Sequence, residues 1–245
     1  MSEPGFTASS VPGLRVLATG ASPRGDLLLR SRRTDAGEVT ELIVNGVFAM
    51  DSVDTSSERA LAARVPPAAR RVLVGGLGLG YTTAALLGRD DLRLDRVDVI
   101  ELEPLLVDWA YDGLTPVLAT VAADPRVRLV VADVAVVLAG RAEPSASWDA
   151  ILLDVDNGPD FLIHDANAAL YGADLLQAAY GRLRPGGVLA IWCQGPARQL
   201  LATLDALGPA EEHRYRVTRG ERSWEYAVYT VSRPHPGLGQ NDGHG

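Results

Sequence analysis

The chain has 245 residues and a formal net charge of −8, and all 23 of its basic residues are arginine. This length predicts one α/β domain with room for a small additional unit, and the acidic balance argues against nucleic acid as the main partner. The absence of lysine excludes Schiff-base chemistry and a Walker-type lysine, and the single Cys193 excludes an intrachain disulfide and a cysteine-based metal cluster. We expect no metal site.

No stretch of the sequence is apolar for long enough to cross a membrane as a helix. The first residues, MSEPGFTASS, lack the pattern of a signal peptide. We therefore expect a cytoplasmic protein without a membrane partner.

The N-terminal part of the chain has a strand-like pattern. Residues 1–12 are small and polar, so we expect them to be disordered. Residues 13–55 carry several apolar runs, and Asn45-Gly46 lies between two of them. Both residues tolerate the positive φ of a type I′ turn, which predicts a hairpin. The segment 13–55 is thus predicted to be a small antiparallel β subdomain.

Residues 56–232 alternate between apolar strands and helical segments, which predicts an α/β fold with a doubly wound, mostly parallel Rossmann-like sheet. The first predicted helix runs from Ser57 to Arg64 with a serine as its N-cap. A later helix spans 170–183 and is closed by RPGG before a buried strand. The domain ends in an antiparallel hairpin, and the tail 233–245 is predicted to be disordered.

A glycine-rich turn follows the first strand of this domain. The apolar run Val72–Val74 leads into Gly76, Gly78 and Gly80, and a helix begins directly afterwards. Glycine allows positive φ and a close approach to a ligand, and a strand–turn–helix unit of this kind holds nucleotides. A dinucleotide fingerprint would place its third glycine at Tyr81. The turn therefore resembles the S-adenosylmethionine turn of class I methyltransferase folds more than that of an NAD-dependent oxidoreductase.

Acidic residues follow the next two strands. Glu101 lies 21 residues after Gly80, the distance expected of a carboxylate that binds both ribose hydroxyls. Helix capping is the alternative role for an acid here, and it fits Glu103 better. Asp133 is positioned to contact the adenine amino group, or else to cap the helix predicted at 134–140.

A further strand ends in the pair Asp154 and Asp156. Two carboxylates can orient an amine and accept its proton as it attacks an electrophile, so both residues are candidate catalytic groups. Asp154 is also expected to contact the donor. Burial and mutual repulsion are expected to raise the pKa of one of the two acids. The alternative is a plain turn over residues 156–159.

The order of these motifs resembles the spermidine synthase (polyamine aminopropyltransferase) family over roughly residues 38–232. GGLGLG matches its glycine turn, IELEP its ribose-binding acids, VVAD its adenine-binding strand end and WDAILLDVDNGP its catalytic segment. The resemblance implies a class I S-adenosylmethionine-dependent methyltransferase fold, with Glu101 on ribose, Asp133 on adenine and Asp154 as the base. It also implies a small-molecule acceptor, with an amine as one candidate, and a homodimer.

Three departures from the family pattern bear on the donor. The turn of the family carries an acid that binds the aminopropyl ammonium of decarboxylated S-adenosylmethionine, and here Leu77 or Leu79 takes its place. Ser56-Ser57 replaces a Tyr-His pair of the polyamine site, and the catalytic loop is about two residues shorter. A turn without the acid tolerates the carboxylate of intact S-adenosylmethionine.

The leading functional hypothesis is a transferase that uses S-adenosylmethionine to alkylate, and most specifically to methylate, a small nucleophile. The first alternative is aminopropyl transfer from decarboxylated S-adenosylmethionine, which makes a polyamine. The second is a homologue that binds nucleoside without catalysis. The product nucleoside is S-adenosylhomocysteine for methyl transfer and methylthioadenosine for aminopropyl transfer.

Overall fold

The computed structural model describes residues 13–160, 162, 165–219 and 222–235. The chain forms two compact units, Met1–Asp54 and Thr55–Gly245. The predicted disordered segment 1–12 and most of the tail 233–245 lie outside the described residues. Within the described ranges, no helix is long and apolar enough to span a membrane.

The N-terminal unit is a four-stranded antiparallel sheet with strand order β1-β2-β3-β4. Asn45 and Gly46 have φ values of 53° and 74°, and Val44 pairs with Val47 across them. This is the predicted two-residue hairpin turn, which is confirmed. The strands are β1 (Leu14–Ser22), β2 (Gly25–Thr34), β3 (Gly37–Val44) and β4 (Val47–Asp51).

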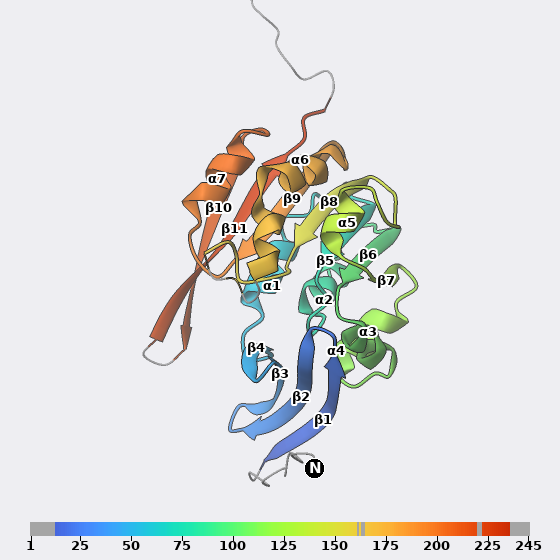
Figure 1. Ribbon diagram of the computed structural model, residues 1–245, viewed down its shortest axis with the longest axis vertical. Helices are drawn as coiled ribbons and strands as arrows, with labels where there is room; N and C mark the ends of the chain where they lie inside the picture. The colour runs from blue at the N-terminus through green and yellow to red at the C-terminus, as the bar shows by residue number, and fades with distance from the viewer. Residues whose placement is uncertain (1–12, 161, 163–164, 220–221, 236–245) are drawn as a thin grey trace, which may run out of the picture. The chain divides into compact units, whose positions relative to one another are not determined.

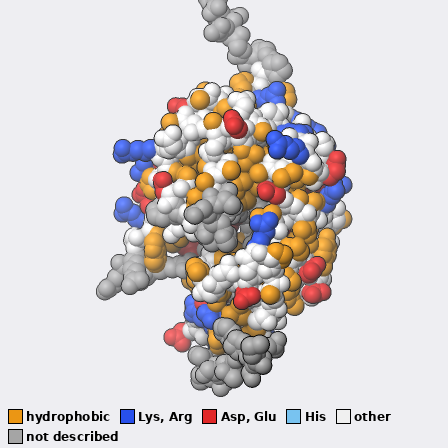
Figure 2. Space-filling view, viewed as in Figure 1, with side chains coloured by type: hydrophobic (Ala, Val, Ile, Leu, Met, Phe, Trp, Pro, Cys, Tyr) orange, Lys and Arg blue, Asp and Glu red, His pale blue; other side chains and the backbone are white. Residues whose placement is uncertain are grey.

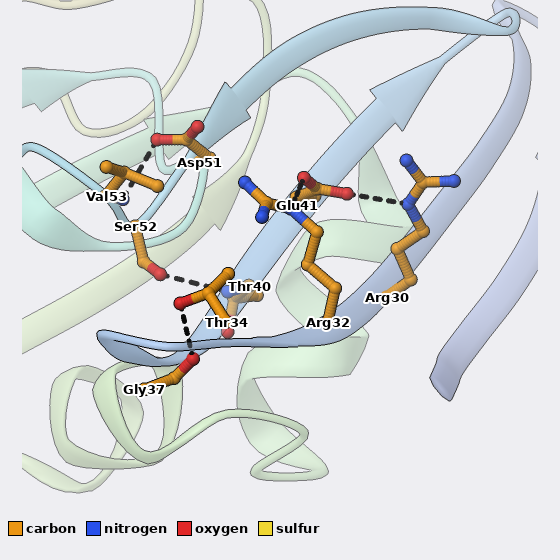
Figure 3. A network of polar contacts seen from close by, with 9 residues as sticks. All are labelled: Arg30, Arg32, Thr34, Gly37, Thr40, Glu41, Asp51, Ser52 and Val53. Atoms are coloured by element: carbon orange, nitrogen blue, oxygen red, sulfur yellow. Dashed lines mark hydrogen bonds and ion pairs between the residues drawn. The ribbon is translucent and has the colours of Figure 1, made fainter. Parts of the chain in front are cut away.

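A buried ion-pair network lies within this sheet (Figure 3). Glu41 is opposite Arg30 in the β2–β3 ladder, and its side chain is only 7% exposed. Its Oε2 accepts a hydrogen bond from Arg30 Nε at 2.8 Å, and its Oε1 accepts one from Arg32 Nε. Burial alone raises the pKa of Glu41, but the hydrogen bonds and charges of the two arginines outweigh it and hold the pKa below its ordinary value.

The larger unit contains a seven-stranded sheet with the order β10-β11-β9-β8-β5-β6-β7 (Figure 1). The five strands from β9 to β7 are parallel, and β11 and β10 add an antiparallel edge. The predicted α/β class and doubly wound sheet are confirmed. The strands are β5 (Arg71–Gly75), β6 (Arg96–Glu101), β7 (Val127–Val131), β8 (Trp148–Leu153), β9 (Leu183–Cys193), β10 (Ala210–Arg219) and β11 (Arg222–Ser232).

Helices lie on both faces of this sheet. On one face α5, α6 and α7 bury leucine, valine and alanine side chains in a core shared with β5, β8, β9 and β11. The helices α1, α2, α3 and α4 form a second contacting set, because α1 packs on α2 and α4 packs on both α2 and α3. The helices are α1 (Ser56–Ala62), α2 (Tyr81–Leu87), α3 (Pro104–Tyr111), α4 (Pro116–Ala123), α5 (Val134–Leu138), α6 (Ala173–Gly181) and α7 (Arg198–Asp205), with the 3-10 helix η1 at Asp165–Tyr171.

Three local predictions are wrong. Helix α1 has Thr55 rather than a serine at its N-cap, and no side chain caps it. The helix predicted at 170–183 is divided at Gly172 into η1 and α6. The RPGG segment belongs to β9, because a register shift against β8 takes up these residues as an irregular stretch of strand.

Charged side chains are interspersed on the face that Figure 2 shows, and basic groups do not gather there into one patch. This distribution, together with the net charge of −8, gives that face no electrostatic footprint for a phosphate backbone.

The Glu41 network generates a stability prediction. Glu41→Gln should lower the free energy of unfolding by about 1–3 kcal/mol at pH 7, because two arginines lose their carboxylate. The pKa of Glu41 is lower in the folded protein than in the unfolded chain. The ionised carboxylate therefore stabilises the fold fully at pH values above its ordinary pKa, and this stabilisation is lost as the pH falls through the pKa of the folded state. In urea unfolding, the difference in free energy of unfolding between the wild type and Glu41→Gln should therefore become smaller as the pH is lowered. The control is Glu38→Gln, whose 3.5 Å pair with Arg15 is exposed. Equal effects of both variants would contradict the prediction.

Candidate functional site

The candidate site lies at the carboxyl edge of the parallel strands, where the strand order reverses between β5 and β8. In open α/β sheets this switch point is the usual place for a ligand. Backbone hydrogen bonds join the strand ends there, each 2.9 Å long: Gly76 N to Ile100 O, Asp154 N to Gly75 O, and Ala132 N to Glu101 O. They bring the glycine turn and the loops that carry Glu101, Asp133 and Asp154 to one edge.

The glycine turn is tightly constrained. Gly76 has φ 93°, and a Cβ there would lie 2.1 Å from the carbonyl oxygen of Asp154. Gly78 and Gly80 also have positive φ, and Gly80 is the N-cap of α2. Only glycine meets both the backbone angle and the close approach at position 76.

The two leucines of this turn are buried, with 5% of Leu77 and 1% of Leu79 exposed. They pack into the protein and present no charged group to a ligand. A ligand at this turn would therefore meet backbone and no charged side chain.

Glu101 is 7% exposed at the end of β6. Its Oε2 accepts a hydrogen bond from Leu77 N at 2.7 Å, and its Oε1 accepts one from Glu103 N at 2.8 Å. Burial raises the pKa of Glu101, and the surrounding backbone amides oppose this rise. The backbone amides of Leu102 and Gly78 also hydrogen-bond to this carboxylate, so a contact with ribose hydroxyls stays a prediction. Glu103 caps α3 by accepting from Leu105 N.

Asp133 is exposed and caps α5, with Oδ1 accepting from Ala135 N at 2.8 Å. The capping role weighed in the sequence analysis is thus present. The second oxygen of the carboxylate is left for another donor, so an adenine contact stays a prediction.

Asp154 follows β8 directly, and its Oδ2 accepts a hydrogen bond from Thr82 Oγ1 of α2 at 2.6 Å. Burial raises the pKa of Asp154 to about 6, although the Thr82 hydrogen bond lowers it and the charge of Glu58 raises it further. A carboxylate with such a pKa is suited to accept a proton near neutral pH.

The carboxylate that acts on Asp154 comes from α1 and not from the neighbouring loop. We expected repulsion between Asp154 and Asp156, but Glu58 supplies the repulsion. Asp156 is 6% exposed, and its Oδ2 accepts from Asn167 Nδ2 of η1 at 2.6 Å. Its Oδ1 accepts from Asn157 N at 2.7 Å. Asp156 therefore fastens the loop to η1.

Sequence reasoning missed Glu58, Thr82 and Asn167. Thr82 follows the glycine turn by two residues, so its hydroxyl was a detectable signal. Glu58 and Asn167 lie far from Asp154 and Asp156 along the chain, and no local motif marks them. In the described residues, no group of three or more acidic, histidine or cysteine side chains is arranged to bind a metal.

Similar solved structures define the class of fold. A spermidine synthase bound to the transition-state analogue AdoDATO has a TM-score of 0.70 and 19% identity, covering 89% of this chain and 74% of the other. Thermotoga maritima spermidine synthase has a TM-score of 0.68 and 19% identity, with 89% and 72% covered. A Klebsiella pneumoniae structure described as a putative O-methyltransferase has a TM-score of 0.51 and 19% identity, with 74% and 82% covered. The fold is that of class I S-adenosylmethionine-dependent methyltransferases, in its spermidine synthase-like form.

Similar sequences extend this assignment. The polyamine aminopropyltransferase of Mycobacterium tuberculosis is 28% identical over 182 residues, which cover 71% of this chain and 34% of the relative. Polyamine aminopropyltransferase 2 of Pseudomonas aeruginosa is 31% identical over 166 residues, covering 61% and 42%. The chain thus spans about a third of the first relative and under half of the second. No family model matches. In sequence and in fold the chain is similar to polyamine aminopropyltransferases and spermidine synthases.

The raised pKa of Asp154 predicts a stabilising substitution. Between its ordinary pKa of 3.8 and its folded pKa of about 6 the folded state binds this proton and the unfolded state does not, so stability falls as the pH rises. Two pKa units correspond to about 3 kcal/mol above pH 7. Asp154→Asn should remove much of this cost, so that its thermal midpoint exceeds that of the wild type at pH 8 and approaches it at pH 4.

The matched control is Asp90→Asn, an exposed carboxylate after α2. It should leave the midpoint nearly unchanged at both pH values. If the thermal midpoint of Asp154→Asn lies below that of the wild type at pH 8, the ionised carboxylate of Asp154 does not destabilise the folded protein and the prediction is wrong.

Proposed function

We propose that this chain transfers an alkyl group from a sulfonium nucleoside to a small amine. The observation that carries the proposal is Asp154, a carboxylate with a pKa of about 6 at the switch point beside the glycine turn. The amine lone pair attacks the carbon next to the sulfonium, and the carbon–sulfur bond breaks with its electrons going to sulfur. Asp154 accepts the proton that the amine loses, and the neutral thioether nucleoside leaves.

The donor nucleoside is proposed to lie along the edge formed by Gly76–Gly80 and the ends of β6 and β7. In this proposal the turn packs along the aminoacyl or aminopropyl chain, Glu101 lies beside the ribose hydroxyls and Asp133 binds the adenine amino group. This arrangement depends on Gly76, because a side chain at that position would displace the Asp154 loop.

Aminopropyl transfer from decarboxylated S-adenosylmethionine is the leading form of this reaction. The relatives in sequence are named polyamine aminopropyltransferases, and two of the similar structures are named spermidine synthases. The acidic surroundings of Asp154 also favour cations, and both the aminopropyl donor and an amine acceptor are cationic.

Methyl transfer from intact S-adenosylmethionine is the second candidate. Buried Leu77 and Leu79 leave no acid in the glycine turn that would repel the donor carboxylate, and helix α2 begins directly after this turn. Placing Asp at position 79 would bury a charge in the core, so that variant is a poor probe of donor choice.

Incubation of the purified chain with 1,4-diaminobutane and each donor separates the two forms. We expect mass spectrometry to find methylthioadenosine from the decarboxylated donor, and Asp154→Asn to lower its rate by about 10²- to 10⁴-fold. If only the intact donor reacts, and S-adenosylhomocysteine is its product, the reaction is methyl transfer. Nucleoside binding without either product would contradict catalysis.

The donor site has a separate test by calorimetry with methylthioadenosine. Glu101→Ala should weaken binding by about 1.5–3 kcal/mol, because it removes hydrogen bonds to a charged group. Asp108→Ala is the matched control, since it removes an exposed acid of the neighbouring helix α3. Unchanged affinity in a folded Glu101→Ala protein would contradict the assignment.

The cytoplasmic location and a homodimer stay predictions.

A further inference from the structure

The side chain of Asp154 is held by the helix that follows the glycine turn. Thr82 lies in the first turn of α2, and its Oγ1 donates a hydrogen bond to Oδ2 of Asp154 at 2.6 Å. A threonine in a helix often donates to a carbonyl three or four residues before it, whereas Thr82 donates to a distant segment of the chain. Only 4% of Thr82 is exposed, so its hydroxyl is directed at Asp154 from within the protein.

The backbone of Asp154 is held by the strand that precedes the same turn. Its amide donates to Gly75 O at 2.9 Å, and a Cβ at Gly76 would lie 2.1 Å from its carbonyl oxygen. One residue therefore contacts both ends of the glycine turn, with β5 on its backbone and α2 on its carboxylate. A donor that lies along Gly76–Gly80 would meet a carboxylate whose place is set by the turn itself.

The hydroxyl of Thr82 also distinguishes the two oxygens of this carboxylate. Oδ2 accepts from Thr82, and no residue in the described part of the chain donates a hydrogen bond to Oδ1. The χ2 torsion of aspartate is broad and roughly two-fold, so a carboxylate without such a partner exchanges its two oxygens. Asp154 is partly exposed, so a ligand can reach it. The hydrogen bond thus leaves Oδ1 as the oxygen that can take a proton.

We propose that Thr82 is a positioning residue of this site, which holds Oδ2 of Asp154 and so presents Oδ1 to the acceptor amine at a place fixed relative to the donor. This inference rests on the proposed function and deepens it, because it assigns a role to a residue other than the base. In the transfer step the amine nitrogen bonds to the carbon beside the sulfonium, and the carbon–sulfur bond breaks towards sulfur. The proton of the nitrogen passes to Oδ1, and Thr82 keeps its own proton and acts only through Asp154.

The same hydrogen bond bears on the pH at which Asp154 is ionised. Burial raises the pKa of Asp154 to about 6, the bond from Thr82 lowers it because it favours the ionised form, and the charge of Glu58 from α1 raises it. Tyr171 of η1 also interacts with Asp154, but burial raises the pKa of this phenol, so it stays neutral. Asp156 follows in the same loop and is bound to η1. Loss of the Thr82 hydroxyl should therefore raise the pKa of Asp154.

Thr82→Val tests this role, because valine keeps the shape of threonine and removes only the hydroxyl. Carbon-detected NMR should find that Asp154 titrates at a higher pH in Thr82→Val than in the wild type, and Thr82→Ser should restore the wild-type titration. With decarboxylated S-adenosylmethionine and 1,4-diaminobutane, Thr82→Val should lower kcat by about tenfold at pH 7 and move the acid limb of the kcat profile to higher pH. Affinity for methylthioadenosine should change by less than about twofold. Thr82→Ala removes the same hydroxyl and replaces Thr82→Val if the valine variant does not fold.

The matched control is Thr83→Val, which removes the hydroxyl of the neighbouring buried threonine of α2. It should leave the titration of Asp154 and the pH profile of kcat as they are in the wild type. Equal effects of Thr82→Val and Thr83→Val, or an unchanged Asp154 titration in Thr82→Val, would overturn the proposal. A shifted titration with unchanged kcat would also overturn it, because the bond would then have no part in the reaction. If the wild type forms no product from either donor, the proposed function fails and the catalytic role of Thr82 fails with it, while the titration still reports the bond to Asp154.

Discussion

The contact between Gly76 and the carbonyl of Asp154 is the constraint on which the candidate site depends. The two strand ends approach so closely that a Cβ at position 76 would lie 2.1 Å from that oxygen. The amide of Gly76 is meanwhile bonded to the carbonyl of Ile100, so the same residue touches the ends of β8 and β6. This approach sets where the glycine turn, Glu101 and Asp154 lie relative to one another, because all three follow directly from the joined strands.

Burial acts on two acids of this edge and has different consequences for each. Glu101 is surrounded by backbone amides, which hydrogen-bond to its carboxylate and oppose the rise of its pKa. Asp154 receives one hydroxyl and faces another carboxylate, so its charge is costly and its affinity for a proton rises. Because their surroundings differ in this way, we propose Glu101 as a binding group and Asp154 as a base.

The features that could be predicted from sequence are those determined by short stretches of chain. The alternation of apolar strands and helices predicted the α/β class. The pair Asn45-Gly46 predicted the hairpin, because the backbone angles of that turn depend on these two residues. The order of acids after strands placed Glu101 and Asp154 at one edge, because parallel strands end on the same side.

The features that were missed depend on contacts between distant segments. The charge of Glu58 acts on Asp154 because α1 packs on α2, and Asp156 accepts a hydrogen bond from Asn167 of η1. The RPGG segment has the composition of a helix stop, yet pairing with β8 draws it into a strand. Tertiary contacts decide these cases, and local composition does not record them.

The departures of this chain from the family pattern concern charge and leave the scaffold intact. The backbone that holds a nucleoside is a property of strand ends and glycines, so it persists where side chains change. An ammonium group, by contrast, needs an opposing charge from some side chain, and the turn offers only buried Leu77 and Leu79. If the site binds a cation, its counter-charge must come from another element that reaches the same edge. Asp154 follows β8 at that edge and supplies such a charge when it is ionised, so the charge of the site and the backbone of the glycine turn come from different elements.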